Sequence, residues 1–317
     1  MKLVVRGLLV LAAAAVVTQS GAAAPARTRL VTRPGSAIFW TSRVGLLGVG
    51  YCASKVVRCR GGSVERTTDG GRTYHVVLRT RRPVTALLRV GSQGAIATVA
   101  DSLARRTLDG GRTWRQFLFK PFFWATPRIV LRFDAYYRGS AQLLALRLSH
   151  DGGRTFRRLT DPCNQAVTYN AYADPVTPKQ WWILCVGRPA GGTADKAVFR
   201  TRDGGKSWQT GAANLGPPNL RVHGGIGLFG YPNGLAFAPN GFGLVTESQG
   251  TLYVSRDGGL HFHAQRKVER PGVDYGAGAA AFANGVGYVL LRAGFATRLV
   301  ATHDSGRTWQ VVRRWSG

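Results

Sequence analysis

The chain of 317 residues carries 43 lysines and arginines against 15 aspartates and glutamates, which gives a formal net charge of +28. Hydrophobic residues make up 44% of it, enough for a sizeable core, and 42 glycines favour a turn-rich β protein over a helical one. A surface this basic attracts polyanions by long-range electrostatics.

The N-terminus has the pattern of a secretory signal peptide, which we place at residues 1–26. Lys2 and Arg6 form a basic start, residues 7–17 (GLLVLAAAAVV) are apolar, and residues 20–26 (SGAAAPA) offer small-residue cleavage positions. This apolar stretch is too short to cross a bilayer, which needs about 20 residues. An uncleaved anchor is the alternative.

The rest of the chain, residues 27–317, is expected to form one soluble, monomeric domain that is secreted or periplasmic and has no transmembrane segment. Length alone would suggest about two domains, but the internal repeats described below override that expectation. Outside the cytoplasm a basic surface meets proteins and anionic glycans of the cell envelope. We therefore expect one of these as the partner, and not nucleic acid.

Four cysteines fit an oxidising compartment. Cys52 and Cys59 are seven residues apart, and Cys163 and Cys185 are 22 apart. Neither pair has the C-x-x-C spacing of a zinc site or a redox motif. We predict two local disulfides, one within each pair, with free buried thiols as the alternative.

One short motif, [S/T]-x-D-x-G-x-[S/T]-aromatic, recurs six times along the chain. The copies are TTDGGRTY (67–74), TLDGGRTW (107–114), SHDGGRTF (149–156), TRDGGKSW (201–208), SRDGGLHF (255–262) and THDSGRTW (302–309). Their aspartates are Asp69, Asp109, Asp151, Asp203, Asp257 and Asp304. A carboxylate can accept backbone N–H bonds across a tight loop, and glycine supplies a positive φ without steric cost. One carboxylate per loop is too few for calcium, and the motif lacks the first glycine of a Walker loop. We interpret the motif as a structural turn, with a ligand site as the alternative.

Between these motifs the chain repeats short strands separated by turn signals. The fifth repeat is the clearest: residues 234–241, 242–248 and 251–259 have the pattern of three strands, with Asn240–Gly241 as a hairpin turn. The aromatic residue after each motif opens a fourth strand. Four antiparallel strands per roughly 40–50 residues form the blade of a β-propeller. We predict an all-β, six-bladed β-propeller in which each motif joins the third and fourth strands of a blade, and seven blades are the less favoured alternative. Residues 27–33 can add an edge strand that helps to close the ring.

These motifs resemble Asp-boxes, also called bacterial neuraminidase repeats, over residues 36–315. Families that carry them include sialidases, sortilin-type receptors, some endoglucanases and the photosystem II stability/assembly factor family of non-enzymatic propellers. The last is the most similar in repeat style, as GSVERTTDGGRTY (62–74) and GTLYVSRDGGLHF (250–262) illustrate. Members of that family usually have seven blades, and a count of six departs from this. The resemblance implies that the boxes lie opposite the functional face, which loops between second and third strands and linkers between blades would form. It does not assign a function, because unrelated activities share the repeat.

A glycosidase needs two carboxylates, one on each side of the scissile bond. Outside the boxes, Glu247 lies in a predicted hairpin between a second and a third strand and is the candidate catalytic residue. Asp161, Asp195 and Asp274 lie in loops on the same predicted side. A resemblance to sialidases would also require an F-R-I-P motif, which the chain lacks. The histidines form no metal-ligand pattern apart from an H-x-H pair at 261–263, so we expect no metal and no cofactor.

Two features are candidates for recognition. In the segment FKPFFWATPR, the side chains of Phe122, Phe123, Trp124 and Arg128 can form a platform for a sugar or a peptide, with core filling between blades as the alternative. In addition, five of the six boxes place a basic residue between the glycine and the hydroxyl residue. This cationic rim consists of Arg72, Arg112, Arg154, Lys206 and Arg307. It either docks an anionic partner or is merely solvated turn charge.

Taken together, these patterns predict an exported, non-enzymatic propeller that acts as a binding or assembly scaffold for a protein or an anionic glycan. A sialidase-like glycoside hydrolase acting on extracellular glycans is the alternative. The two differ in one structural requirement. The enzyme needs at least two convergent carboxylates in a central pocket, whereas a funnel lined by arginine, glycine and apolar groups favours binding.

Overall fold

The computed structural model describes residues 30–53, 59–99, 103–118, 122–138, 141–165, 169–214, 223–248, 251–268 and 275–316. These segments consist almost entirely of β-strands and turns, with no α-helix and one short 3-10 helix, η1 (Pro162–Gln165). None of their helices is long and apolar enough to cross a membrane. The predicted signal peptide lies outside the described residues.

The strands follow one another in chain order as antiparallel sets of four. The first set is β1 (Leu30–Phe39), β2 (Gly45–Ala53), β3 (Cys59–Thr67) and β4 (His75–Thr80). The second is β5 (Val84–Val90), β6 (Gly94–Val99), β7 (Leu103–Thr107) and β8 (Arg115–Leu118). The third is β9 (Phe123–Trp124), β10 (Val130–Arg138), β11 (Ala141–Ser149) and β12 (Arg157–Arg158). The fourth is β13 (Asn170–Pro175), β14 (Trp181–Val186), β15 (Lys196–Thr201) and β16 (Gln209–Ala213). The fifth is β17 (Tyr231–Phe237), β18 (Gly243–Ser248), β19 (Tyr253–Ser255) and β20 (His263–Ala264). The sixth is β21 (Tyr275–Ala281), β22 (Gly287–Ala293), β23 (Ala296–Thr302) and β24 (Gln310–Trp315).

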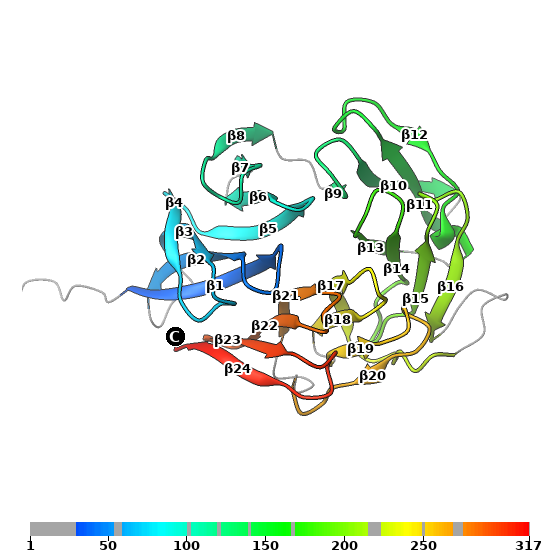
Figure 1. The fold of residues 1–317 in the computed structure, drawn as a ribbon. Coiled ribbons are helices and arrows are strands. Elements are labelled where there is room, and N and C mark those ends of the chain that lie inside the picture. The colour runs from blue at the N-terminus through cyan, green and yellow to red at the C-terminus, as the bar shows by residue number, and fades with distance from the viewer. Residues whose placement is uncertain are drawn as a thin grey trace, which may run out of the picture.

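Within each set, strands that are neighbours in sequence are neighbours in the sheet. A parallel bridge between Val90 and Trp124 links the second and third sets, and a bridge between Ser248 and Tyr275 links the fifth and sixth. Figure 1 shows the sets arranged around a common centre, each beginning with its innermost strand. The prediction of an all-β fold made of four-stranded antiparallel units of the propeller type is confirmed. The number of blades and the closure of the ring remain predictions.

One local expectation meets a different outcome. Residues 30–33, predicted as part of an edge strand that closes the ring, instead continue β1, where Leu30 pairs with Ala53 and Arg33 with Gly50. The reason is that β2 runs on to Ala53 and offers these residues a partner. Residues 27–29 lie outside the described segments. In the third set the innermost strand, β9, contains only two residues.

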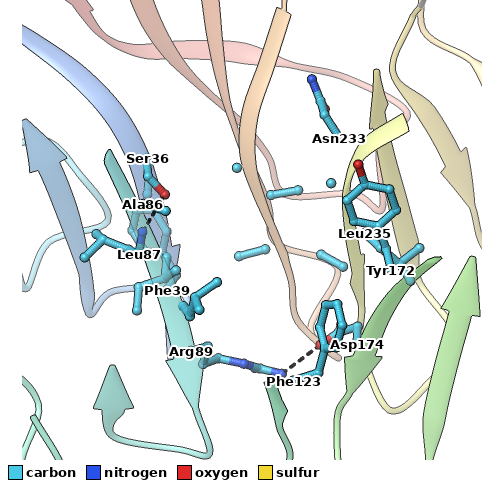
Figure 2. Close-up of a pocket in the computed structure, with 18 of the residues that line it drawn as sticks. Ser36, Phe39, Ala86, Leu87, Arg89, Phe123, Tyr172, Asp174, Asn233 and Leu235 are labelled. Atoms are coloured by element: carbon cyan, nitrogen blue, oxygen red, sulfur yellow. Dashed lines mark hydrogen bonds and ion pairs between the residues drawn. The ribbon is translucent and has the colours of Figure 1, made fainter. Parts of the chain in front are cut away.

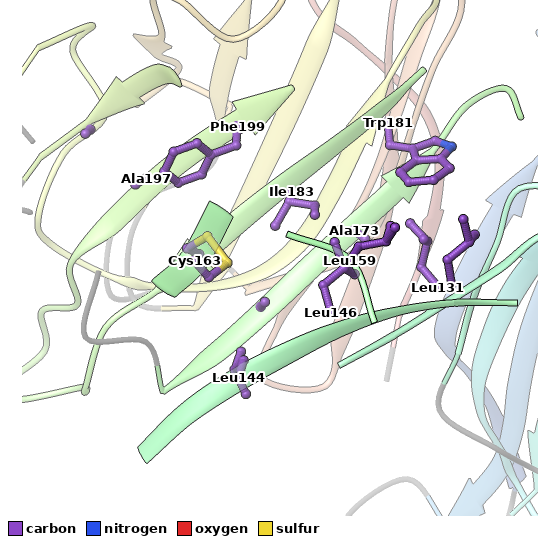
Figure 3. Packing of buried hydrophobic residues seen from close by; sticks show 14 residues of the cluster. Leu131, Leu144, Leu146, Leu159, Cys163, Ala173, Trp181, Ile183, Ala197 and Phe199 are labelled. Atoms are coloured by element: carbon purple, nitrogen blue, oxygen red, sulfur yellow. A yellow bond between two sulfur atoms is a disulfide. The ribbon is translucent and has the colours of Figure 1, made fainter. Parts of the chain in front are cut away.

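A hydrophobic core lies between neighbouring sets. Between the third and fourth sets, Trp181 packs with Leu131 and Leu146 (Figure 3). Trp182 points to the opposite side of β14 and stacks on Phe237 of the fifth set, with ring centroids 4.6 Å apart. Because successive strand residues point to opposite faces, this Trp-Trp pair fills two cores at once.

The first and last sets also share a core. Phe39 of β1 stacks on Tyr288 of β22 with ring centroids 4.1 Å apart, and the Tyr288 hydroxyl donates a hydrogen bond to the Ser42 carbonyl at 2.7 Å. Gly278 of β21 approaches β1 so closely that a Cβ there would lie 2.7 Å from the Ala37 carbonyl oxygen. The two ends of the described chain are therefore packed side by side.

Each box motif forms the same hydrogen-bonded hairpin. The Asp69 carboxylate accepts hydrogen bonds from the hydroxyls of Thr67 and Thr73, at 2.8 and 2.6 Å, and from the Thr73 N–H at 3.0 Å. The Thr67 hydroxyl oxygen in turn accepts the Gly71 N–H at 2.9 Å. The hydrogen bonds from Thr73 hold the pKa of Asp69 well below its usual value. The other five aspartates bind their own turns in the same way, with the His261 ring nitrogen replacing one hydroxyl.

The boxes define one face of the molecule. The N–H of Gly70 donates to the carbonyl of Arg43, in the turn between the first two strands of the set, at 2.9 Å. Equivalent bonds recur in every set, so the box hairpins and the turns between first and second strands lie together on what we call the box face. The opposite face, formed by turns between second and third strands and by linkers between sets, is called the loop face.

Both predicted disulfides are present. Cys52 of β2 is bonded to Cys59 of β3 across the hairpin of the first set. Cys163 of η1 is bonded to Cys185 at the end of β14. The two disulfides therefore brace the loop face, as the spacing of the cysteines predicts.

Candidate functional site

The innermost strands of all six sets surround one central cavity. Its walls are residues of β1, β5, β9, β13, β17 and β21, and its volume is about 350 Å³. Figure 2 shows side chains from several of these strands around the cavity. Cavities of this kind, where many elements converge, are the usual place for a ligand in proteins. The central cavity is therefore the first candidate site.

An ion pair crosses one part of this cavity. Arg89 of β5 reaches Asp174 of β13, with Nη2 3.2 Å from Oδ1 (Figure 2). The second carboxylate oxygen of Asp174 accepts the Phe237 backbone N–H of β17 at 2.6 Å. Burial raises the pKa of Asp174, and the Arg89 charge and the Phe237 N–H act against that rise. One carboxylate thus ties together the second, fourth and fifth sets.

The remaining walls are uncharged. Tyr172, Asn233 and Leu235 lie on one side of the cavity (Figure 2). The opposite side, from β1 and β21, consists mainly of glycine, alanine and Ser36, whose hydroxyl oxygen accepts the Leu87 N–H. The lining therefore combines one arginine–aspartate ion pair with glycine, apolar and uncharged polar groups.

The three aromatic residues of the predicted recognition platform all line the central cavity, and Arg128 does not join them there. Phe122 and Trp124 are at the same time buried in the core between the second and third sets, whereas Phe123 is half-buried. Arg128 is exposed on the box face, where its carbonyl accepts the Gly152 N–H at 2.9 Å. The alternative of core filling therefore holds for Phe122 and Trp124. Strand alternation explains why neighbouring aromatic residues go to different environments.

Glu247, the candidate catalytic residue, lies in β18 and is inaccessible. Its side chain and that of Lys196 in β15 are both 0% exposed, with Nζ 3.0 Å from Oε1. Lys196 also donates to the carbonyls of Gly227 and Leu228, and Glu247 accepts the Thr251 N–H. Burial raises the pKa of Glu247 to about 7 and lowers that of Lys196, against their mutual attraction. Glu247 thus lies at the end of a second strand, as predicted, but is buried in an ion pair that joins the fourth set to the fifth, and a catalytic role for it stays a hypothesis.

The other loop carboxylates do not converge on the central cavity either. Asp161 is buried beside η1, where it accepts the Cys163 N–H at 2.8 Å. Asp195 is half-buried and its side chain lies beside Gly187. Asp274 lies outside the described residues. Among the residues that line the cavity, Asp174 is the one carboxylate.

The cationic rim is exposed on the box face in all five of its positions. In three sets a second basic residue lies beside the rim residue. It belongs to the turn between the first and second strands, whose carbonyl accepts the N–H of the box glycine. These neighbouring pairs are Arg43 with Arg72, Arg128 with Arg154, and Lys179 with Lys206. In the described segments no group of three His, Cys, Asp or Glu side chains is placed to hold a metal ion.

Exposed apolar side chains are concentrated on the other face. Eight of the eleven large hydrophobic residues with substantial exposure lie at strand ends or linkers of the loop face. They are Leu30, Leu118, Tyr137, Tyr169, Leu228, Phe229, Tyr275 and Phe295. The guanidinium of Arg33 lies over the Phe295 ring, 4.3 Å from its centroid. The box face therefore carries the cationic rim, whereas most of the exposed apolar side chains lie on the loop face, beside exposed arginines such as Arg81, Arg82 and Arg188.

Comparison with known proteins gives structural likeness only. No protein-family model matches the sequence, and no curated protein matches it. Among solved structures, the chain is similar to YCF48 from Cyanidioschyzon merolae, at 13% identity and TM-score 0.43, over 90% of this chain and 86% of that one. It is also similar to an α-L-arabinanase from Penicillium chrysogenum complexed with arabinobiose, at 13% identity and TM-score 0.49, over 89% and 98% of the two chains. An α-L-arabinofuranosidase from Fusarium graminearum matches at 12% identity and TM-score 0.46, over 83% and 88%. Likenesses this distant carry no argument about function.

Sequence reasoning did not single out Arg89 and Asp174. The one signal was a charge on an otherwise apolar inner strand, since Asp174 stands in NAYADP, where Ala171 and Ala173 are buried. Its partner is 85 residues away in the sequence, and only the assembled fold brings the two together.

Proposed function

We propose that the protein is an exported, non-enzymatic, six-bladed β-propeller that binds a protein partner through its loop face. The observation that carries the proposal is the chemistry of the central cavity. Glycoside hydrolysis needs two carboxylates roughly 5–10 Å apart, and the described lining holds Asp174 alone, already bonded to Arg89 and the Phe237 N–H. Such a cavity has no pair of groups for acid–base or nucleophilic work.

The composition of the loop face supports a protein as the partner. Leu118 is 77% exposed and Phe295 49% exposed, and an arginine covers the Phe295 ring. Aromatic residues combined with arginine are enriched at protein interfaces. Clusters of exposed apolar residues on one face mark interaction sites. Exposed arginines lie on both faces, so charge alone does not favour the loop face for an anionic glycan, whereas exposed apolar side chains favour a protein there.

The remaining parts of the proposal concern architecture and location. Six strand sets with a core between neighbours, including the last and the first, support six blades closed into one ring. Two disulfides support an extracytoplasmic location. With residues 1–26 as a signal peptide, residues 27–317 would then be the single exported domain.

The test compares two double variants in quantitative capture from an envelope extract. Leu118→Ser with Phe295→Ser removes apolar surface from the loop face, and Leu108→Ser with Val311→Ser removes similar exposed residues from the box face. We expect a protein held by the wild type to be held by the box-face variant and lost by the loop-face variant. The captured protein is then purified and its affinity for all three chains measured directly.

Two results would refute the proposal. One is equal retention of every captured protein by both variants. The other is hydrolysis of aryl glycosides, including sialosides, by the purified chain and its loss in Asp174→Asn. The second result would establish the glycosidase alternative.

A further inference from the structure

A second depression opens on the box face between the first and last sets. Its volume is about 470 Å³, and it shares no lining residue with the central cavity. The walls come from the turn before β2, the first box, the turn before β22, the sixth box and the start of β24. The side chains that bring charge or hydrogen-bonding groups include Arg43, Arg72, Asn284, His303 and Gln310. We call this depression the junction site.

Two arginines, Arg43 and Arg72, line the junction site. The turns that carry Arg43 and Arg72 are held together by the Gly70 N–H, which donates to the Arg43 carbonyl at 2.9 Å. Arg313 of β24 donates to the Arg72 carbonyl at 3.0 Å and fixes the same turn to the last set. The side chains of Arg43 and Arg72 are exposed, and within the described segments neither forms an ion pair.

The one carboxylate in the lining is already committed. Asp69 accepts hydrogen bonds from Thr67, Arg72 and Thr73 of its own turn, and those from Thr73 hold its pKa low. The N–H of Arg72 that it accepts is the backbone one, so the guanidinium is available to a ligand. The site therefore offers two forked cations to an incoming anion.

We propose that the junction site binds the terminal phosphate of a phosphate monoester. An arginine side chain presents parallel N–H donors that fit two oxygens of one anion. A carboxylate has only two oxygens and one charge, which a single arginine satisfies. A phosphate monoester carries roughly −1.5 to −2 charges at neutral pH and three oxygens, so it can engage both guanidiniums together with the Asn284 and Gln310 amides. The inference is independent of the loop face and of the partner proposed for it.

The third set provides a matched control. Arg128 and Arg154 occupy the equivalent turn positions and are joined by the equivalent bond, from the Gly152 N–H to the Arg128 carbonyl at 2.9 Å. Neither lines the junction site. Removing either pair of arginines changes the net charge by the same amount, so the comparison separates a built site from general attraction to a basic surface.

The test is calorimetric titration of the purified full chain with inorganic phosphate at neutral pH and low salt. We expect Arg43→Ala with Arg72→Ala to weaken binding at least about tenfold, and Arg128→Ala with Arg154→Ala less than about twofold. Arg43→Lys with Arg72→Lys keeps the charge but loses the forked donors, and should fall between them. Thermal unfolding of each variant checks that it is folded.

A second arm asks where the phosphate comes from. Flotation with phosphatidylcholine vesicles containing phosphatidic acid reports a lipid source, and binding of inorganic phosphate without flotation reports a soluble one. Equal weakening in the two alanine double variants would overturn the proposal, because bulk charge would then explain the binding. No binding by the wild type in either arm would overturn it as well.

Discussion

At the scale of single residues, the buried carboxylates are the least predictable part of the molecule. The sequence places Glu247 near the end of a strand, beside a turn, where an active-site group could lie. In the structure it is fully buried against Lys196, which comes from another strand set. Pairing of this kind depends on how sets pack, and no local pattern in the sequence records it. Breaking such a pair is costly because it leaves one buried charge without a partner.

Asp161 gives a prediction about pH at this scale. It is 6% exposed, and burial raises its pKa from 3.8 to about 6. Between these two pH values the folded chain keeps a proton that the unfolded chain has released, so stability falls as pH rises. The contribution of this group is fully present below pH 3.8 and is lost as pH rises through about 6.

The check is urea denaturation of the wild type and Asp161→Asn at several values between pH 4 and pH 7. Asparagine keeps an oxygen that can accept the Cys163 N–H but does not titrate in this range. We expect the wild type to lose up to about 3 kcal/mol relative to the variant across the window. Parallel pH profiles of the two proteins would show that the Asp161 carboxyl is not shifted.

At the scale of the element, the box hairpin was well predicted because its signals are local. Five boxes place glycine directly after the aspartate, with φ between 73° and 81°. The sixth has Ser305 there, at φ 57°, the one non-glycine residue with positive φ in the described segments. The three strands predicted in the fifth repeat were also found, as β17, β18 and β19, since turn residues bound them. The third set was harder, because its inner and outer strands have two residues each.

Ser305 leads to a prediction about stability that can be tested by two opposite substitutions at equivalent positions of two boxes. A side chain in the left-handed region costs roughly 1 kcal/mol relative to glycine. Ser305→Gly should therefore raise the free energy of unfolding by up to about 1 kcal/mol. Gly110→Ser places the same residue at the equivalent position of the second box, where an added Cβ meets no atom within 4 Å. It should lower stability by a similar amount.

Chemical denaturation of the two single variants and the wild type measures both changes. The double variant should return close to the wild-type value, since the two boxes lie in different sets and distant effects add. Destabilisation by Ser305→Gly would show that the serine has a role beyond its backbone conformation.

At the scale of the whole molecule, the repeated motif predicts the four-stranded set but not how the first and last sets contact each other. The number of boxes and the strands between them are read from local patterns. The ion pair of the central cavity, between Arg89 and Asp174, and the junction between the first and last sets are long-range contacts. At that junction β1 pairs only with β2 and β24 only with β23. The ends are therefore joined by side-chain packing and a few hydrogen bonds, without a shared strand.

The stability of the contact between the first and last sets can be compared with that of the contact between the fourth and fifth sets. Phe39 and Phe237 are the last residues of β1 and β17, and both are almost fully buried. Each stacks on an aromatic residue of the preceding set, Phe39 on Tyr288 and Phe237 on Trp182. The contact is thus repeated, once where the chain ends meet and once inside the array.

If the first and last sets close a ring, Phe39→Ala and Phe237→Ala should each cost about 3–5 kcal/mol, as expected for a large aromatic side chain removed from a core. Each variant should also unfold in one transition with an unchanged dependence on urea, followed by both tryptophan fluorescence and far-UV circular dichroism. A terminal join that opens freely gives a different result. The loss of unfolding free energy in Phe39→Ala would then be much smaller than that in Phe237→Ala, or Phe39→Ala would unfold in two steps. The reason is that in an open array the end sets can separate before the rest unfolds. Equal costs would mean that packing alone holds the ends as firmly as the continuous chain holds its interior sets.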